Sequence, residues 1–161
     1  MSISVGDKLP EANFLVMTGD GPSGMSTSDV FAGKKVAAFA VPGAFTPTCH
    51  LKHLPGFLDH LNDFKDHGVD TVACIAVNDI FVLDAWAKNS GAEGKILFLA
   101  DGNGDFTKAI GLDFDASAVG LGMRSKRYAM LVDDGVVKVL NIEDAPASAI
   151  ISSADELLKS L

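Results

Sequence analysis

Three short apolar runs, each followed by a segment with helical spacing, constrain the fold of this chain most. The runs cover residues 35–41, 69–77 and 96–100, and each is continuous rather than alternating. Continuous runs of this length indicate strands that are buried on both faces, as in parallel sheets. Because such strands alternate here with helical segments, the sequence predicts an α/β fold with a parallel core.

The longest predicted helix follows the first apolar run. Apolar residues recur at helical spacing over residues 51–65, and Gly68 ends the pattern. Pro55 lies inside it and cannot donate to the carbonyl of Leu51, so we expect a kinked helix. Three further helices are expected at residues 79–88, at residues 106–110, and after Ser153, which forms a capping-box pattern with Glu156.

Both ends of the chain carry strand signals. Near the start, residues 13–17 predict a strand and residues 19–24 a loop. Residues 126–132 and 136–142 flank an Asp-Asp-Gly turn, a pattern typical of an antiparallel hairpin. The whole pattern predicts a mixed central β-sheet with helices on both faces.

Length and charge narrow the class of protein. The 161 residues are expected to form one domain, 1–161. Twenty-one acidic and 13 basic residues give a net charge of −8, which repels nucleic-acid phosphates and anionic membranes, so we expect neither as a partner. The N-terminal residues carry no basic segment followed by an apolar stretch, and we expect a cytoplasmic protein.

The segment Val-Pro-Gly-Ala-Phe-Thr-Pro-Thr-Cys, residues 41–49, joins the first apolar run to the long helix. Thr46 is expected to cap this helix and Pro47 to occupy its first position, which places Cys49 in the first turn. A thiolate there faces unsatisfied backbone N–H groups and the positive end of the helix dipole. Cys49 is therefore the candidate nucleophile, with a packing role as the alternative.

Arginine occurs at only two positions, Arg124 and Arg127, and every other cation is lysine. The guanidinium has a fixed charge and a planar set of donors, which lysine cannot reproduce. This pair therefore indicates a site that needs such geometry. The alternative is a solvated pair beside a strand.

The spacing Pro42-x-x-x-Thr46-x-x-Cys49 resembles the active-site motif of the peroxiredoxins. The longer string 41–49, with His-Leu-Pro-Gly-Phe at 53–57 and Val-Asn-Asp at 77–79, is similar to the type II, or peroxiredoxin-five, subfamily. The resemblance runs from about Val5 to the C-terminus. It implies a thioredoxin-like fold and cysteine-dependent reduction of hydrogen peroxide and organic hydroperoxides. It also implies a thiol electron donor and no metal, haem or flavin cofactor.

The resemblance assigns roles to individual residues. Cys49 would be the peroxidatic cysteine, oxidised to sulfenic acid, and Thr46 the hydroxyl that hydrogen-bonds the peroxide. Arg127, just before Tyr128, would be the active-site arginine, and Pro42 would shield the thiolate from water. The role of Arg124 stays open.

Cys74 has two interpretations. It lies in the middle of the second apolar run, where a small core residue is the plain expectation. Its spacing from Cys49 also matches a possible resolving cysteine of the subfamily, but a disulfide would need local unfolding. The late resolving cysteine of other members is absent after Cys74. We therefore expect an external electron donor: glutathione, glutaredoxin or thioredoxin.

Several further alternatives remain at this stage. His50 and His53 have helical spacing, but no third ligand accompanies them, and no metal site is expected. The chain lacks a Cys-x-x-Cys pair, which disfavours a thiol-disulfide oxidoreductase. A peroxide-sensing switch or binding protein with Cys49 as the sensor thiol is the alternative function. The resemblance further implies a homodimer, with Phe45 and nearby loops at the contact.

Overall fold

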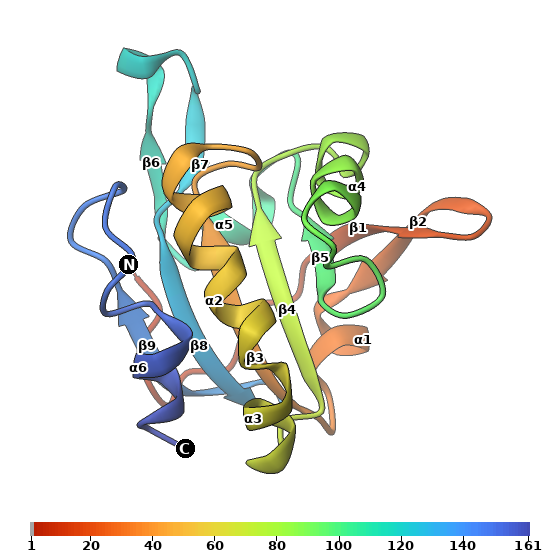
Figure 1. Cartoon of the computed structure of the whole chain (residues 1–161), viewed down its shortest axis with the longest axis vertical. Coiled ribbons are helices and arrows are strands. Elements are labelled where there is room, and N and C mark those ends of the chain that lie inside the picture. Colours follow the sequence, from red (N-terminus) through yellow and green to blue (C-terminus); the bar gives the residue numbers. More distant parts are fainter. Residues whose placement is uncertain (1) are drawn as a thin grey trace.

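A computed structural model describes residues 2–161 and shows a twisted sheet with helices on both faces (Figure 1). The seven strands have the order β2-β1-β5-β4-β3-β8-β9. The parallel centre consists of β3 (Lys35–Val41), β4 (Thr71–Ala76) and β5 (Leu97–Ala100). These are the three continuous apolar runs, and almost all of their residues are buried. The predicted mixed central sheet is confirmed.

Antiparallel strands complete both sides of the sheet. β8 (Tyr128–Asp133) pairs with β3, and β9 (Val136–Ile142) pairs with β8 through the predicted hairpin. Asp134 and Gly135 in its turn both have positive φ, 49° and 77°, as a tight two-residue turn requires.

The opposite side of the sheet corrects one prediction. β1 (Asn13–Thr18) pairs with β5 and also with β2 (Gly21–Ser26). The loop expected at residues 19–24 is therefore wrong from residue 21 onward, and only residues 19 and 20 form a turn. β2 is an edge strand with no buried residue. It therefore lacks the apolar alternation by which a strand is recognised.

Two apolar layers hold the helices on the sheet. One packs the face that carries Phe39, Cys74 and Cys49, and the other packs the opposite face around Phe14 and Tyr128. By the residues that they contribute to each layer, four helices cover the first face and two the second. Figure 1 shows helices in front of the sheet and behind it. They are α2 (Leu54–Asp59), α3 (Leu61–Asp66), α4 (Ile80–Asn89) and α6 (Ala154–Leu158), then α1 (Thr27–Phe31) and α5 (Asp105–Ala109).

The long helix predicted over residues 51–65 is interrupted twice. It starts with a π-helical turn, η1 (Cys49–His53), and the N–H of Leu54 donates to the carbonyl of Cys49, five residues back. Pro55 follows at the start of α2, where its missing N–H is tolerated. His60 then separates α2 from α3. The irregular turn of this helix is thus at Cys49 rather than at Pro55, and π-helical turns frequently occur at functional sites.

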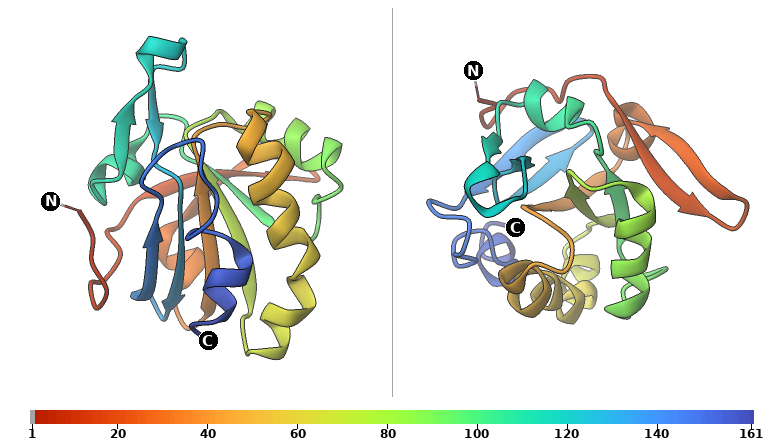
Figure 2. Two further views of the ribbon diagram at one scale, coloured as in Figure 1. Left: turned by 60° about the vertical axis from the view of Figure 1, so that its left-hand side comes forward. Right: turned by 90° about the horizontal axis from the view of Figure 1, so that it is seen from above.

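A short ribbon projects beyond the sheet, above the end where β3 stops (Figure 2). It consists of β6 (Asp113–Asp115) and β7 (Met123–Ser125), joined through the 3₁₀ turn η2 (Ser117–Val119). The strand predicted at residues 126–132 begins only at Tyr128, which leaves Arg127 at the junction between ribbon and sheet. Among residues 2–161, no helix has both the length and the apolar character that a membrane crossing requires.

Candidate active site

Cys49 lies where the chain leaves the centre of the sheet and enters a helix. The helical segment begins at Pro47, and the N–H of His50 donates to the carbonyl of Thr46 at 2.8 Å. The predicted helix start is therefore confirmed, and Cys49 is in its first turn. The sulfur itself is fully buried, within the apolar layer that also contains Val41 and Leu54.

The sequence predicts that Thr46 caps this helix, but its side chain makes other contacts. Its hydroxyl lies 2.7 Å from the carbonyl oxygen of Gly43 and 2.8 Å from Sγ of Cys49. A hydroxyl carries one proton and can donate to only one of these acceptors at a time. When Cys49 is ionised, the sulfur is the stronger acceptor, so the Thr46 hydroxyl stabilises the thiolate directly.

The loop before the helix is held in a strained shape. Phe45 has a φ of 64°, in the left-handed region that a bulky side chain rarely adopts. Beside it, the N–H of Ala44 donates to Oδ1 of Asn78 at 2.9 Å. Gly43 lies against Arg124, because an added Cβ would come within 2.7 Å of Nη1 and would displace the guanidinium. The connection between β4 and α4 therefore holds this loop, and the projecting ribbon packs against it.

Arg127 reaches the same sulfur from the other side of the site. Its side chain is 2% exposed, and Nη2 lies 3.0 Å from Sγ of Cys49. Nε and Nη2 also donate to the carbonyl of Pro146, at 3.2 and 3.1 Å, and Nη1 lies 3.0 Å from Nδ1 of His53. The planar guanidinium thus joins three segments that are far apart in the sequence.

His53 holds the guanidinium without taking its charge. Because a guanidinium only donates, Nδ1 of His53 must accept, and the ring proton lies on Nε2, which donates to the carbonyl of Ser152 at 2.8 Å. Burial and the positive charge of Arg127 lower the pKa of His53 to about 3. The imidazole is therefore neutral at physiological pH.

The charge of Arg127 has one natural partner. Within the described part of the chain, no carboxylate lies within ion-pair distance of its guanidinium. Its other acceptors, a carbonyl oxygen and a neutral imidazole, carry no net charge. A buried cation needs a counter-charge, and the thiolate of Cys49 is in position to supply it.

Pro42, which is expected to shield the thiolate, and Arg124, whose role the resemblance leaves open, contact each other. Pro42 is buried at the end of β3, and its carbonyl accepts from Nη1 of Arg124 at 3.2 Å. Arg124 also donates from Nε to the carbonyl of Leu121 at 2.9 Å. The structure therefore brings Arg127, and not Arg124, to the sulfur. Arg124 links the projecting ribbon to the loop.

Cys74 is fully buried in β4, and it packs in the same apolar layer as Cys49. Both cysteines are free thiols. Burial, with a smaller contribution from Cys49, raises the pKa of Cys74 well above its ordinary value. A thiol that resists ionisation attacks a sulfenic acid slowly, which supports the packing interpretation.

The two histidines with helical spacing are occupied by other partners. Nδ1 of His50 accepts from Nε1 of Trp86 at 3.0 Å, and both ring nitrogens of His53 are hydrogen-bonded. Across residues 2–161, no three His, Cys, Asp or Glu side chains gather as a metal site requires. The roles of His53 and Ser152 escaped the sequence analysis, because nothing in their spacing connects them to Arg127.

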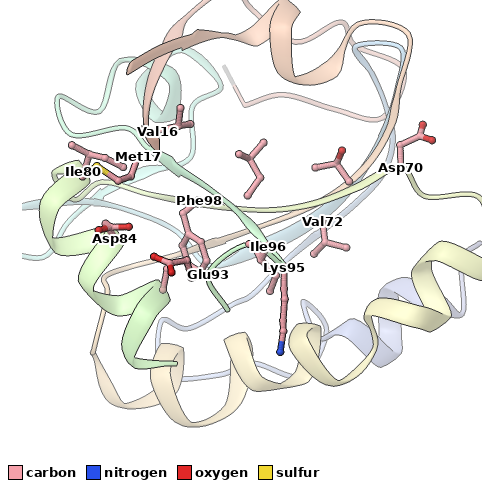
Figure 3. A pocket seen from close by; sticks show the side chains of 14 residues that line it. Val16, Met17, Asp70, Val72, Ile80, Asp84, Glu93, Lys95, Ile96 and Phe98 are labelled. Atoms are coloured by element: carbon pink, nitrogen blue, oxygen red, sulfur yellow. The ribbon is translucent and has the colours of Figure 1, made fainter. Parts of the chain in front are cut away.

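A pocket of about 400 Å³ lies between α4 and the strands β1 and β5, away from this site. Figure 3 shows Met17, Ile80 and Phe98 around it, with Asp84 and Glu93 at its rim. Its lining includes no cysteine, histidine or arginine, so it has no counterpart of the arrangement around Cys49.

Comparisons with known proteins show which family this chain resembles. The Redoxin family profile matches residues 4–158. Peroxiredoxin-2E, chloroplastic, of Arabidopsis thaliana is 50% identical over 165 residues, which cover 99% of this chain and 70% of that protein. Among solved structures, reduced Prx3 of Vibrio vulnificus in complex with H2O2 has a TM-score of 0.93 and 47% identity, covering 98% of each chain. Peroxiredoxin 5 of Alvinella pompejana has a TM-score of 0.86 and 38% identity, covering 98% of this chain and 97% of that one.

Proposed function

This chain belongs to the peroxiredoxins, thiol-dependent peroxidases with a thioredoxin-like fold, and from that premise we propose that Cys49 is its peroxidatic residue. The observation that carries the proposal is the pair of donors on one buried sulfur. Thr46 and Arg127 approach Sγ to 2.8 and 3.0 Å from different segments. The substrate is a hydroperoxide, which these same donors would bind beside the thiolate.

The reaction follows from these contacts. The Cys49 thiolate attacks the terminal oxygen of the hydroperoxide, so an S–O bond forms while the O–O bond breaks. Sulfur is oxidised to the sulfenic acid, and the leaving oxygen departs with the electron pair as hydroxide or alkoxide. It then takes a proton from solvent to give water or an alcohol. Arg127 faces the charge that develops on these oxygens, and the buried Pro42 keeps water from the sulfur.

The donors contribute more than ionisation of the thiol does. Lowering a thiol pKa from about 8.5 to about 6 raises the thiolate fraction at neutral pH roughly 30-fold. The same change lowers the nucleophilicity of each thiolate about tenfold for a Brønsted slope near 0.45. The net gain is about threefold, far below the rate enhancement typical of an enzyme. The larger part must come from stabilising the peroxide oxygens in the transition state.

We propose an external thiol, glutathione, glutaredoxin or thioredoxin, as the electron donor. The first thiol condenses with the sulfenic acid to a mixed disulfide and releases water. A second thiol then restores Cys49 and leaves as a disulfide. The burial of Cys74 supports this route, because the sequence contains no third cysteine that could resolve the sulfenic acid.

A homodimer and a cytoplasmic location complete the proposal. Phe45 is 45% exposed, and its strained backbone holds it in the loop that precedes Cys49. A contact through this residue would cover it, and Phe45→Ala should then shift the sedimentation equilibrium toward monomer. Unchanged association would exclude Phe45 from the interface.

A reducing compartment keeps both cysteines as thiols, which supports the cytoplasmic location, and cell fractionation tests it.

The proposed roles are tested by Cys49→Ser. Serine is nearly isosteric with cysteine but stays un-ionised at neutral pH, so peroxide reduction should be abolished with each thiol donor. Circular dichroism should show an unchanged fold, and Cys74→Ser serves as the matched control that keeps turnover. Activity near wild type in Cys49→Ser would move the chemistry to another residue.

A further inference from the structure

The loop between β9 and α6 supplies the site with backbone carbonyls rather than side chains. In Figure 2 it rises beside the start of the helix that carries Cys49. The carbonyl of Pro146 accepts two hydrogen bonds from Arg127, at 3.2 and 3.1 Å. The carbonyl of Ala147 accepts from Oγ1 of Thr48 at 3.1 Å, and that of Ser152 accepts from His53 at 2.8 Å.

Packing does not hold this loop in place. None of residues 144–151 is buried, and Ile150 and Ile151 are 71% and 42% exposed. Its sequence, Asp-Ala-Pro-Ala-Ser-Ala-Ile-Ile, provides few polar side chains that could anchor it. A segment with so little buried surface opens at low free-energy cost unless hydrogen bonds close it. The position of Pro146 therefore depends on hydrogen bonds, which are the bond from Thr48 to the Ala147 carbonyl and those that fix the two ends of the loop.

Glu143 fixes both ends. Its side chain is 9% exposed, and Oε2 accepts from the N–H of Ser152 at 2.7 Å and from the hydroxyl of Ser152 at 2.6 Å. Its backbone N–H donates to the carbonyl of Arg127 at 2.9 Å. Charge-assisted hydrogen bonds to a buried carboxylate are among the stronger ones in proteins. Glu143 thus joins the two ends of the loop, and its backbone is hydrogen-bonded to Arg127, the residue that the Pro146 carbonyl contacts.

We propose that Glu143 is a positioning residue for Arg127, closing the loop 144–151 so that the Pro146 carbonyl holds the guanidinium against Cys49. Oε2 of the carboxylate accepts both bonds from Ser152, and within residues 2–161 no hydrogen bond or ion pair joins Glu143 to the guanidinium. Arg127 is consequently held by neutral acceptors, and its charge stays available to the thiolate. This inference rests on the proposed role of Arg127 in peroxide reduction.

The test compares Glu143→Ala with Glu143→Gln. Gln keeps an oxygen that can accept both bonds from Ser152, whereas Ala removes it. Glu11→Ala is the matched control, because Glu11 also accepts from a serine, Ser28, at 2.9 Å, but on the exposed surface. The readouts are the second-order rate with H2O2, the pH midpoint of Cys49 alkylation, and amide hydrogen exchange over residues 144–151.

Glu143→Ala should speed exchange in the loop, raise the pH midpoint and lower the rate about tenfold or more, since small displacements of a catalytic group are costly. Glu143→Gln should keep most of the rate, and Glu11→Ala should match wild type. Fast loop exchange with a wild-type rate and midpoint would overturn the inference.

Two further variants cover the case in which Glu143→Ala fails to fold and separate this inference from the proposed role of Arg127. If Glu143→Ala does not fold, Ser152→Ala removes only the hydroxyl bond and should give a partial loss of rate, and a wild-type rate there would refute the inference. Arg127→Lys separates the two proposals. A wild-type rate in Arg127→Lys would refute the role of Arg127 itself, whatever Glu143→Ala shows.

Discussion

Replacement of Arg127 by lysine is the sharpest test of the site, because it keeps the positive charge and removes the geometry. The guanidinium contacts the Pro146 carbonyl, Nδ1 of His53 and Sγ of Cys49 at once, with distances between 3.0 and 3.2 Å. These acceptors lie around a planar group. A lysine ammonium is a single point on a flexible stem and cannot serve all of them together.

The expected loss follows from the contacts. A hydrogen bond that involves a charged group contributes about 1.5–3 kcal/mol. Each 1.4 kcal/mol of lost transition-state stabilisation corresponds to about a tenfold lower rate. If the Arg127→Lys variant loses one such bond to the reacting oxygens, the second-order rate with H2O2 should fall about 10- to 150-fold.

Stopped-flow fluorescence measures this rate, and the chain has a suitable reporter. Trp86 is the one tryptophan in the sequence, and its Nε1 donates to His50, the residue next to Cys49. Arg124→Lys is the matched control, since Arg124 contacts the carbonyls of Pro42 and Leu121 and not the sulfur. It should lose less activity than Arg127→Lys. Equal losses in the two variants, or a wild-type rate for Arg127→Lys, would refute the reasoning.

Three further predictions concern neighbouring groups. Thr46→Val removes the hydroxyl that contacts Cys49 at nearly constant volume and should lower the rate at least about tenfold by stopped flow, whereas Thr46→Ser should stay close to wild type. Because burial and Arg127 lower the pKa of His53 to about 3, against about 6.5 when unfolded, the unfolded chain binds the additional proton between these values. The free energy of unfolding should therefore fall as pH decreases from about 6.5 toward 3, by at most about 1.4 kcal/mol per pH unit, and urea titrations of His53→Gln should lack this component. Cys74→Ala should cost on the order of 1 kcal/mol of stability while turnover with glutathione or glutaredoxin continues, and a dominant Cys49–Cys74 disulfide by mass spectrometry in the wild type would contradict the packing role of Cys74.

Local patterns were sufficient for the centre of the molecule. The continuous apolar runs predicted β3, β4 and β5, because a strand buried on both faces must be apolar at every position. Pro47 predicted where the helix begins, since proline suits the first helical position, and this placed Cys49 in the first turn. Features that depend only on residues close together in the sequence, such as a buried strand or a helix start, can therefore be predicted from the sequence.

Exposed or irregular backbone was harder to predict. The sequence predicts a loop where β2 lies, because backbone pairing with β1, rather than apolar burial, makes it a strand. The π-helical turn at Cys49 also has no composition of its own, since it differs from an α-helix only in which carbonyl each N–H reaches. Elements that are defined only by their backbone hydrogen bonds are therefore hard to predict from the sequence.

The electrostatics of the site were decided by tertiary structure. The sequence offered two arginines three residues apart, and only the start of β8 determines that Arg127 faces the sulfur while Arg124 faces the loop. His53 and Arg127 are 74 positions apart, and no sequence pattern in either segment predicts the hydrogen bond between them. The sequence determined which nucleophile is available, because a helix start is a local structure. The arrangement of charge around it depended on the sheet, because hydrogen bonds between distant segments exist only once the strands bring those segments together.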